Sequence, residues 1–505
     1  MNYKVIGPPG TGKTQTLLDT VKEYVDKGTP LNQIGYFAFT RKAANEARDR
    51  YLKSRPDLEK KDIEYFRTLH SLAFRRLNLK EENILQEEHY RVIGEQAGLR
   101  IRYAPYEKNA FNGIFTDKSE YLTIINLAKL RNITVLEQLD RHEHLGRIER
   151  DKLFILDKKI EEYKHEYNLI DFNDMILQFI EKKDKEYKKG QTVCPLFKVI
   201  FIDEAQDLSP LQWEMVKVLQ QHSSNVYVAG DDDQAIFGWA GADVKSFINF
   251  EAVEIPLQQS HRVPQIVHRR ALQRLDNIVG GRIDKKYFPT ADKGNVSTYF
   301  SIDAINLSQG DWYILARTND LLRPIITQLH RRGIYYETRH GKSLSKHLYQ
   351  DILNWEKWKK GGQLNTIEAQ RVFERLGLKL KETTDKMFTL NSLIALHPTI
   401  KKVPWYDAFT EVTPKTKTYI RAMRKNGENL QEKPRVRVTT LHGSKGGEAS
   451  NVIILQNQTT NTIKAARKSI TKRDEEQRVW YVGITRTKHN LFLIRSKDRS
   501  KEFKI

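Results

Sequence analysis

The chain has 505 residues, too many for one hydrophobic core, and this length predicts about three or four domains. Its 85 Lys and Arg outnumber 64 Asp and Glu, which gives a formal net charge of +21. This excess favours a polyanionic partner, nucleic acid before an anionic membrane surface, with a solvated basic surface as the alternative. Cys194, the single cysteine, excludes disulfides within the chain and cysteine-built zinc or iron–sulfur sites.

The hydropathy pattern gives no indication of a membrane protein. No apolar run approaches the roughly 18 residues that a membrane span needs, and the chain opens on a predicted strand rather than a signal peptide. A hydrophobic content of 39% favours a folded protein over a disordered one. We therefore expect a chain with no membrane contact in a reducing, cytoplasmic compartment.

The first predicted elements are a strand at residues 5–6 and a helix at 15–25, joined by a glycine-rich turn. The turn matches the phosphate-binding pattern G-x-x-x-x-G-K-S/T. Glycines let backbone N–H groups surround phosphates, and the helix N-terminus adds its positive end. Lys13 is expected to reach the β- and γ-phosphates and the Thr14 hydroxyl to bind Mg²⁺, although a surface turn could share the pattern. The predicted nucleotide-binding residues are Gly7, Pro8, Pro9, Gly10, Thr11, Gly12, Lys13, Thr14 and Gln15.

Two polar clusters follow predicted apolar segments. Phe39 and Thr40 end a strand at 34–39 and precede an alanine-rich helix, so they are suited to stacking a base and holding a phosphate. Phe39 could equally belong to the core. The same two readings apply to Thr68 and His70, which precede an amphipathic helix.

Residues from about 80 to 195 differ in character. They are charged and mostly helical in pattern, with helices predicted at 121–130 and 151–163, and they lack glycine-rich turns. We interpret them as an inserted helical domain. Its aromatic residues could face nucleic acid, but core positions are favoured for Tyr103, Tyr106, Phe111 and Phe115.

A second strong signal is the apolar run at 198–202, which ends in Asp203 and Glu204. The pattern predicts a buried parallel strand with two carboxylates at its carboxyl end, where open α/β sheets bind ligands. Asp203 could hold Mg²⁺ through water, and Glu204 could orient and deprotonate an attacking water. An acidic turn after a strand is the alternative.

Another predicted strand, at 225–229, leads into a polar loop. Gln234 could sense a γ-phosphate by hydrogen bonding, while Phe237 and Trp239 are suited to stacking on bases. One short loop could therefore contact both the nucleotide and the nucleic acid. A motor that couples hydrolysis to movement requires such a link between its two ligands.

Together these segments resemble the successive motifs of superfamily 1 helicases of the UvrD/Rep type. Similar later motifs occur in the family's order, so that the matches extend from residue 6 to about residue 494. The later matching segments are residues 257–262, 314–319, 438–448 and 475–486.

The resemblance implies an α/β fold with two RecA-like motor domains, parallel sheets flanked by helices, and a mainly helical insert in each. The implied first motor comprises residues 1–79 and 196–255, and its insert comprises residues 80–195. The implied second motor comprises residues 256–345 and 432–505, and its short insert comprises residues 346–431. The resemblance further implies ATP and Mg²⁺ as cofactors in the cleft between the motors. It implies single-stranded DNA and single-strand/duplex junctions as partners, and a monomeric motor moving 3′→5′.

Individual roles are also carried over by the resemblance. Arg262 and Arg486 would stabilise γ-phosphate charge, a task for which Arg is better suited than Lys. Both are then expected on the second motor, so that catalysis needs closure. The implied catalytic residues are Lys13, Glu204, Gln234, Arg262 and Arg486; the implied metal residues are Thr14 and Asp203; Glu448 would face the nucleotide sugar; and the implied DNA-binding residues are Phe39, Thr40, Thr68, His70, Phe237, Trp239, Arg317, Thr440 and His442.

The chain departs from the family pattern at several positions. No adenine-reading glutamine segment precedes the phosphate loop, and His261 replaces the tyrosine that stacks on adenine, so a tolerant NTPase is a hypothesis. Ala240 stands where an arginine is common. Trp355 and Trp358, spaced i, i+3, predict a packed helix face rather than a DNA wedge.

Several functions remain open beside an ATP-dependent DNA helicase. A single-stranded-DNA translocase that strips proteins shares every motif, and an RNA substrate fits the same backbone and stacking contacts. A relic ATPase with a DNA-binding role conflicts with the intact catalytic set, and a small-molecule kinase explains neither the later motifs nor the charge. With no nuclease module expected, a compact phage or bacterial accessory helicase in DNA repair or replication is our interpretation.

Overall fold

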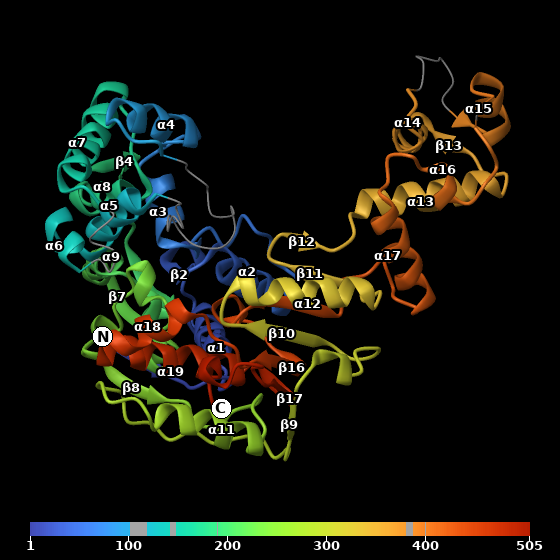
Figure 1. The fold of residues 1–505 in the computed structure, drawn as a ribbon. Coiled ribbons are helices and arrows are strands. Elements are labelled where there is room, and N and C mark those ends of the chain that lie inside the picture. The colour runs from blue at the N-terminus through green and yellow to red at the C-terminus, as the bar shows by residue number, and fades with distance from the viewer. Residues whose placement is uncertain (102–118, 142–147, 189, 380–386, 399) are drawn as a thin grey trace. The chain divides into compact units, whose positions relative to one another are not determined.

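The computed structural model describes residues 1–101, 119–141, 148–188, 190–379, 387–398 and 400–505 (Figure 1). Contacts divide the chain into two compact units. Unit 1 comprises Met1–Asp292 and Ala465–Tyr481, and unit 2 comprises Lys293–Lys464 and Val482–Ile505. The predicted aromatics Tyr103, Tyr106, Phe111 and Phe115 lie outside the described residues.

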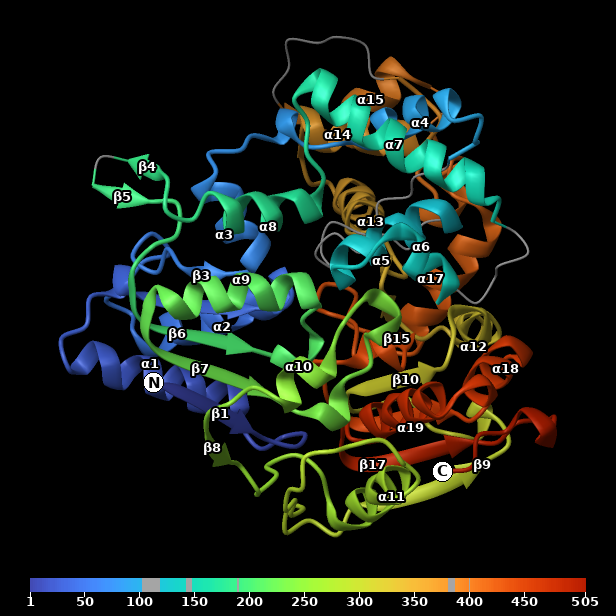
Figure 2. The same ribbon diagram turned by 90° about the vertical axis from the view of Figure 1, so that its left-hand side faces the viewer.

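Unit 1 is built on a six-stranded, fully parallel sheet in the order β3-β2-β6-β7-β1-β8. Its arrows point toward one edge, as β6 and β7 show in Figure 2. Apolar and aromatic runs form the buried central strands, and helices α1, α2 and α9 pack against them. The bounds are β1 Asn2–Ile6, α1 Lys13–Asp26, β2 Ile34–Ala38, α2 Arg41–Ser54, β3 Phe66–Arg67, α3 Leu69–Arg76, β6 Phe197–Asp203, α9 Pro210–Gln221, β7 Ser223–Gly230, α10 Val244–Ile248, β8 Val253–Pro256 and α11 Gln265–Leu275.

A mainly helical insert interrupts unit 1 between α3 and β6. It has its own apolar core, which includes Tyr90, Leu122 and Leu156. Helices α5 and α8 contact α9 of the sheet layer. The predicted helices at 121–130 and 151–163 are confirmed as α5 and α7. The bounds are α4 Glu87–Gln96, α5 Glu120–Arg131, α6 Val135–Asp140, α7 Arg150–Tyr167, α8 Phe172–Glu181, β4 Glu186–Lys188 and β5 Gln191–Thr192.

Unit 2 contains a seven-stranded sheet in the order β12-β11-β15-β10-β16-β17-β9. Every pairing is parallel except that of β11 with β12. The α/β class with parallel sheets is thus confirmed. The bounds are β9 Asn295–Tyr299, β10 Trp312–Ala316, α12 Asn319–Arg331, β11 Tyr336–Thr338, β12 Gly341–Lys342, β15 Val436–Thr440, β16 Ala449–Leu455 and β17 Thr487–Ile494. Helices α18 Thr460–Lys468 and α19 Ile470–Ile484 are each divided between the two units.

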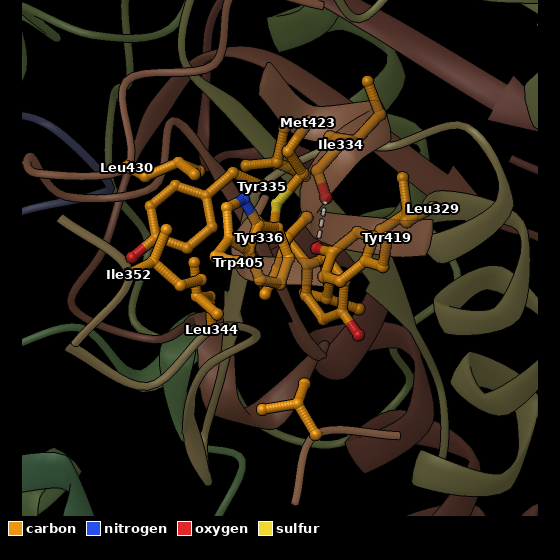
Figure 3. Packing of buried hydrophobic residues seen from close by; sticks show 14 of the residues in the cluster. Leu329, Ile334, Tyr335, Tyr336, Leu344, Ile352, Trp405, Tyr419, Met423 and Leu430 are labelled. Atoms are coloured by element: carbon orange, nitrogen blue, oxygen red, sulfur yellow. Dashed lines mark hydrogen bonds between the residues drawn. The ribbon is translucent and has the colours of Figure 1, made fainter. Parts of the chain in front are cut away.

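The insert of unit 2 shares one apolar core with that sheet. Trp405 and Met423 of the insert belong to the same cluster as Leu329 and Tyr336 of the sheet layer, and the Tyr419 hydroxyl donates to Ile334 O at 2.6 Å (Figure 3). The bounds are α13 Lys346–Lys359, β13 Leu364–Asn365, α14 Thr366–Arg375, β14 Met387–Phe388, α15 Leu390–Leu396, α16 Trp405–Ala408 and α17 Pro414–Lys425.

The packed helix face predicted for Trp355 and Trp358 is confirmed. Both side chains are buried on α13, and their indole N–H groups donate to Val403 O and Phe388 O at 3.1 and 3.0 Å. Both rings therefore hold the insert together rather than presenting a wedge.

The two units are defined by contacts within the chain, and their boundaries differ from the predicted motor boundaries at two places. Residues 256–292 lie in unit 1, and so does the segment Ala465–Tyr481. The four-part division into motors and inserts stays a prediction. Within the described part of the chain, no helix is both long and apolar enough to cross a membrane.

Candidate functional site

The phosphate loop starts where β1 ends, in the interior of the unit 1 sheet. Gly7 N–H donates to Gly230 O of β7 at 3.2 Å, which ties the loop to the neighbouring strand. A Cβ at Gly7 would lie 2.5 Å from Thr11 Oγ1 and 2.7 Å from Lys13 Cγ, so only glycine allows this tight turn. Lys13 Nζ donates to Gly7 O at 2.6 Å, while Gln15 is exposed on α1.

Thr14 and Asp203, far apart in sequence, meet at this edge of the sheet. The Thr14 hydroxyl donates to Asp203 Oδ2 at 2.8 Å, and the Tyr36 hydroxyl donates to the same oxygen at 2.8 Å. The Glu204 N–H donates to Asp203 Oδ1 at 2.9 Å. Burial, and after it the charge of Glu204, raises the pKa of Asp203.

This donor set suits a divalent cation. The Asp203 carboxylate is buried, and the charge of Lys13 lowers its pKa less than burial and Glu204 raise it. A hydroxyl, a carboxylate and an adjacent second carboxylate are the hard oxygen donors that Mg²⁺ prefers, with water completing its shell. Thr14 and Asp203 therefore fit the predicted metal position.

A chain of hydrogen bonds links Glu204 to the end of β7. Gln206 Nε2 donates to Glu204 Oε2 at 2.6 Å, and its Oε1 accepts from Asp231 N–H at 3.1 Å. Gln234 Nε2 in turn donates to Asp231 Oδ2 at 2.8 Å. The two residues predicted to act on water and γ-phosphate are thus connected through Gln206 and Asp231.

Three consecutive carboxylates precede Gln234, all with 0% exposure. Their charges are met by residues after α11. Arg282 pairs in a bidentate manner with Asp233, with N–O distances of 2.6 and 2.8 Å. Lys285 Nζ lies 2.7 Å from Asp231 Oδ1 and 2.9 Å from Asp233 Oδ2, and also bonds to Asp232.

The segment after β8 packs directly on the phosphate loop. Ser260 Oγ donates to Pro9 O at 3.0 Å, and His261 N–H donates to Gly10 O at 2.8 Å. Gly10 has φ +77°, and a Cβ there would lie 2.5 Å from the Arg262 Cβ. Arg262 therefore lies in unit 1 by its contacts, and its place on the second motor stays a prediction. That prediction came from the order of the motifs alone, and motif order carries no information on the contact between Arg262 and Gly10.

The three predicted base-stacking residues form a connected row of rings. Phe39 stacks on Phe237 with ring centroids 5.9 Å apart, and Phe237 meets Trp239 edge-on at 6.5 Å. Phe39 and Phe237 are each 4% exposed, whereas Trp239 is 39% exposed. Trp239 is thus the ring in this row that offers the largest accessible face for stacking.

The other predicted DNA contacts in unit 1 have structural roles here. Thr40 and Thr68 are helix N-caps, whose hydroxyls accept from Ala43 N at 3.1 Å and Ser71 N at 3.2 Å. His70 is buried against Phe172. Burial, and then the charge of Arg41, lowers the pKa of His70 to about 4. Their contact with DNA stays a prediction.

Unit 2 gathers its own predicted residues where parallel strands end. Ala316 of β10 pairs with Thr440 of β15, so Arg317 and Thr440 follow neighbouring strands. Desolvation, followed by the charges of Arg317 and Lys445, lowers the pKa of His442 to about 3. His442 is therefore neutral at pH 7 beside two cations, a setting that suits an anion.

Glu448 and Arg486 lie close together in unit 2. Glu448 pairs with Lys488 at 2.5 Å. Arg486 is buried, with Nε donating to Val482 O at 2.8 Å and a terminal N–H donating to Gly447 O at 3.4 Å. Its proposed contact with γ-phosphate stays a prediction.

Sequence reasoning missed four residues of the unit 1 site. Tyr36 looks like a core aromatic within an apolar strand, and only its register beside β6 brings its hydroxyl to Asp203. Tyr287, whose hydroxyl donates to Pro9 O at 3.0 Å, lies in a segment that no motif covers. Arg282 and Lys285 lie in the same segment, where two cations after a helix were the available signal.

Comparisons with known proteins agree with this geometry. The family model of the UvrD/REP helicase N-terminal domain matches residues 1–253. "ATP-dependent DNA helicase PcrA" of Leuconostoc citreum is 25% identical over 358 residues, which cover 66% of this chain and 47% of that protein. "DNA helicase II" of Haemophilus influenzae is 25% identical over 305 residues, which cover 58% and 41%.

The match to these relatives is partial. The chain spans less than half of the length of the curated relatives it matches. A solved arterivirus helicase, nonstructural protein 10, aligns with 99% of this chain and 60% of that chain, at 11% identity and a TM-score of 0.35. That overlap is too loose to support an argument about this chain.

Proposed function

Because this chain belongs to the UvrD/REP helicase family, we propose that it is an ATP-dependent DNA helicase that translocates on single-stranded DNA, 3′→5′. ATP and Mg²⁺ are its proposed cofactors. Single-stranded DNA and single-strand/duplex junctions are its proposed partners, bound by a monomeric motor in the cytoplasm.

One observation carries the proposal: the Thr14 hydroxyl lies 2.8 Å from Asp203 Oδ2, beside Lys13 and Glu204. A phosphate loop and two carboxylates on one sheet edge form the arrangement that phosphoryl transfer from a nucleotide requires. The surface-turn and acidic-turn alternatives do not account for this meeting of residues about 190 positions apart.

The chemistry follows from the residues of unit 1. Backbone N–H groups of the loop and Lys13 would hold the phosphates. When bound, Mg²⁺ supplies charge neutralisation of the phosphate oxygens, and Thr14 and Asp203 would hold it. Glu204, oriented by Gln206, accepts the proton of the attacking water, and Gln234 senses the γ-phosphate by hydrogen bonding.

Arg262 and Arg486 complete the proposed catalytic set. A guanidinium offers several donors in a fixed plane, which matches the oxygens of a transferring phosphoryl group better than an ammonium does. Arg262 adjoins Gly10, and this supports its role. His261 in place of an adenine-stacking tyrosine supports the further hypothesis of a nucleotide-tolerant enzyme.

DNA binding rests on charge and on Trp239. A net charge of +21 supplies salt-sensitive affinity for phosphates, and the exposed indole supplies a sequence-tolerant grip on bases. Gln234 and Trp239 share one loop, which supports coupling between nucleotide state and DNA grip.

The deciding experiment measures ATP hydrolysis with and without a single-stranded oligonucleotide, for the wild type and for Glu204→Gln. We expect strong stimulation by DNA and a loss of at least about a hundredfold in the variant, the size typical of general-base removal. Equal rates with and without DNA would contradict the coupled motor. A matched control is Glu214→Gln, a half-buried carboxylate on α9 that pairs with Lys217.

Unwinding separates a helicase from a protein-stripping translocase. Duplexes with a 3′ or a 5′ single-stranded tail are compared, with and without a bound protein roadblock. Strand separation from the 3′ tail alone is expected. Roadblock removal without strand separation would favour the translocase.

A further inference from the structure

Residues 279–288, which we name the strap, connect three parts of unit 1. The N–H groups of Val279 and Gly280 donate to the Asp474 carboxylate of α19 at 3.2 and 2.7 Å. The Tyr287 hydroxyl donates to Pro9 O of the phosphate loop. Between these anchors, Arg282 and Lys285 reach the three carboxylates before Gln234. The strap is therefore held at both ends while its middle meets the acidic cluster.

Lys285 is the central cation of that cluster. Its side chain is only 7% exposed, and its Nζ contacts Asp231, Asp232 and Asp233 together. Three buried carboxylates could in principle hold a divalent cation. Here the Lys285 ammonium already stands among them, so the cluster is an ion-pair network rather than a metal site.

The two oxygens of Asp231 serve different partners. Oδ1 accepts from Lys285 Nζ at 2.7 Å, and Oδ2 accepts from Gln234 Nε2 at 2.8 Å. Among the described residues, no other cation forms an ion pair with Asp231. Because an ionised carboxylate can only accept hydrogen bonds, the NH₂ group of Gln234 must face it. Asp231 thereby fixes which way the Gln234 amide points.

We propose that Lys285 is a positioning residue for Gln234 and acts through Asp231. The proposal rests on the proposed function, which makes Gln234 the sensor of γ-phosphate. Without Lys285, Arg282 would be the remaining cation beside three adjacent carboxylates. Their mutual repulsion would displace the Asp231 side chain or raise its pKa so that it binds a proton. Either change releases the amide, because a moved or protonated carboxyl no longer requires the NH₂ group to face it.

A double-mutant cycle on DNA-stimulated hydrolysis tests this relation. The variants are Lys285→Met, Gln234→Ala and the pair, with Lys286→Met, a neighbouring exposed lysine, as matched control. We expect Lys285→Met to lower kcat about tenfold at nearly unchanged KM for ATP, the size of one misplaced hydrogen-bonding group. In a Gln234→Ala background the same change should cost nothing further, because the residue it positions is gone.

Two outcomes of the cycle would overturn the proposal. The first is additive losses, which would mean that Lys285 acts independently of Gln234. The second is a Lys285→Met enzyme indistinguishable from Lys286→Met. If Lys285→Met fails to fold, Lys285→Gln takes its place in the cycle, since it keeps a polar side chain and removes the charge. Non-additivity with Gln234→Ala is again expected.

A readout independent of hydrolysis separates this proposal from the proposed function. In a crystal structure of Lys285→Met, the Gln234 amide should have left Asp231 Oδ2, whereas in Lys286→Met it should remain there. A retained contact in Lys285→Met would overturn the positioning role, whatever the activity. A wild type that fails to hydrolyse ATP with DNA would instead refute the proposed function, with the crystallographic comparison still deciding the role of Lys285.

Discussion

Two buried charge clusters in unit 1 differ in how their carboxylates are balanced. In the helical insert, Lys129 lies 2.8 Å from Asp171 Oδ2, and Lys164 lies 2.8 Å from Asp174 Oδ2. At the sheet edge, Asp203 adjoins Glu204 and accepts from hydroxyl groups. Burial opposes the charge of Asp171, but Lys129 and Lys164 outweigh burial and hold its pKa below the usual range. Burial and Glu204 instead raise the pKa of Asp203.

The difference separates a structural cluster from a candidate site. The insert cluster joins α5, α7 and α8 and satisfies its charges internally, so it contributes to the fold. At the sheet edge, burial and Glu204 make the charge of Asp203 costly despite the nearby Lys13, and a bound cation would lower that cost. A perturbed carboxylate beside a phosphate loop is what a metal-dependent site is expected to show.

The largest expected effect comes from Asp203→Asn. Removal of this proposed Mg²⁺ ligand should lower ATP hydrolysis by at least about a hundredfold, since a bound metal contributes several kcal/mol of charge stabilisation. The melting temperature should not fall, because a neutral amide relieves the repulsion with Glu204. Steady-state hydrolysis and thermal unfolding measure the two effects.

Asp49→Asn, an exposed carboxylate on α2, is the control for Asp203→Asn and should leave both quantities unchanged. A clear fall in melting temperature for Asp203→Asn with hydrolysis retained would reverse the contrast between the two clusters.

Asp171→Asn should behave in the opposite way. Asparagine preserves the N-cap of α8 but leaves Lys129 and Lys164 short of a buried anion. We expect a loss of about 3 kcal/mol in the free energy of unfolding, the size typical of breaking a buried pair. Chemical denaturation measures it, with Glu166→Gln on exposed α7 surface as control. An unchanged free energy of unfolding would show that the insert cluster makes no net contribution to stability.

His70, near the insert cluster, predicts a pH dependence. Its pKa of about 4 lies below the ordinary value of about 6.5, so the unfolded chain binds a proton first as pH falls. Stability should therefore decrease between pH 7.5 and pH 5, by about 2 kcal/mol from this group. The slope should be smaller in His70→Leu, as denaturation at both pH values would measure. Equal slopes would contradict a buried, neutral His70.

Much of the unit 1 edge could be predicted because it depends on local patterns. Apolar runs gave the strands that are now β1, β2, β6 and β7, and parallel strands must end at one edge. The meeting of Thr14 with Asp203 follows from that rule. Trp355 and Trp358 were also assigned correctly, because their i, i+3 spacing fixes one helix face.

The rest depends on contacts that no local pattern encodes. Tyr36 reaches Asp203 only because β2 pairs with β6 in one register, Ala38 opposite Asp203. Lys285 meets Asp231 across 54 positions. Because tertiary packing decides such pairings, the local sequence around Lys285 and Tyr36 does not indicate their roles.

The smallest expected effect concerns the aromatic row beside the site. Trp239 is accessible, whereas Phe39 and Phe237 are buried and stack on each other. Trp239→Ala should weaken binding of an oligo-dT strand about tenfold, since stacking of one base contributes about 1–3 kcal/mol. Fluorescence anisotropy at fixed salt measures it, and Trp239→Phe should retain part of the affinity. Phe237→Ala should instead lower the melting temperature. If Trp239→Ala binds like the wild type while Phe237→Ala does not, the buried rings must become exposed when DNA binds, and the row is then a movable part of the site.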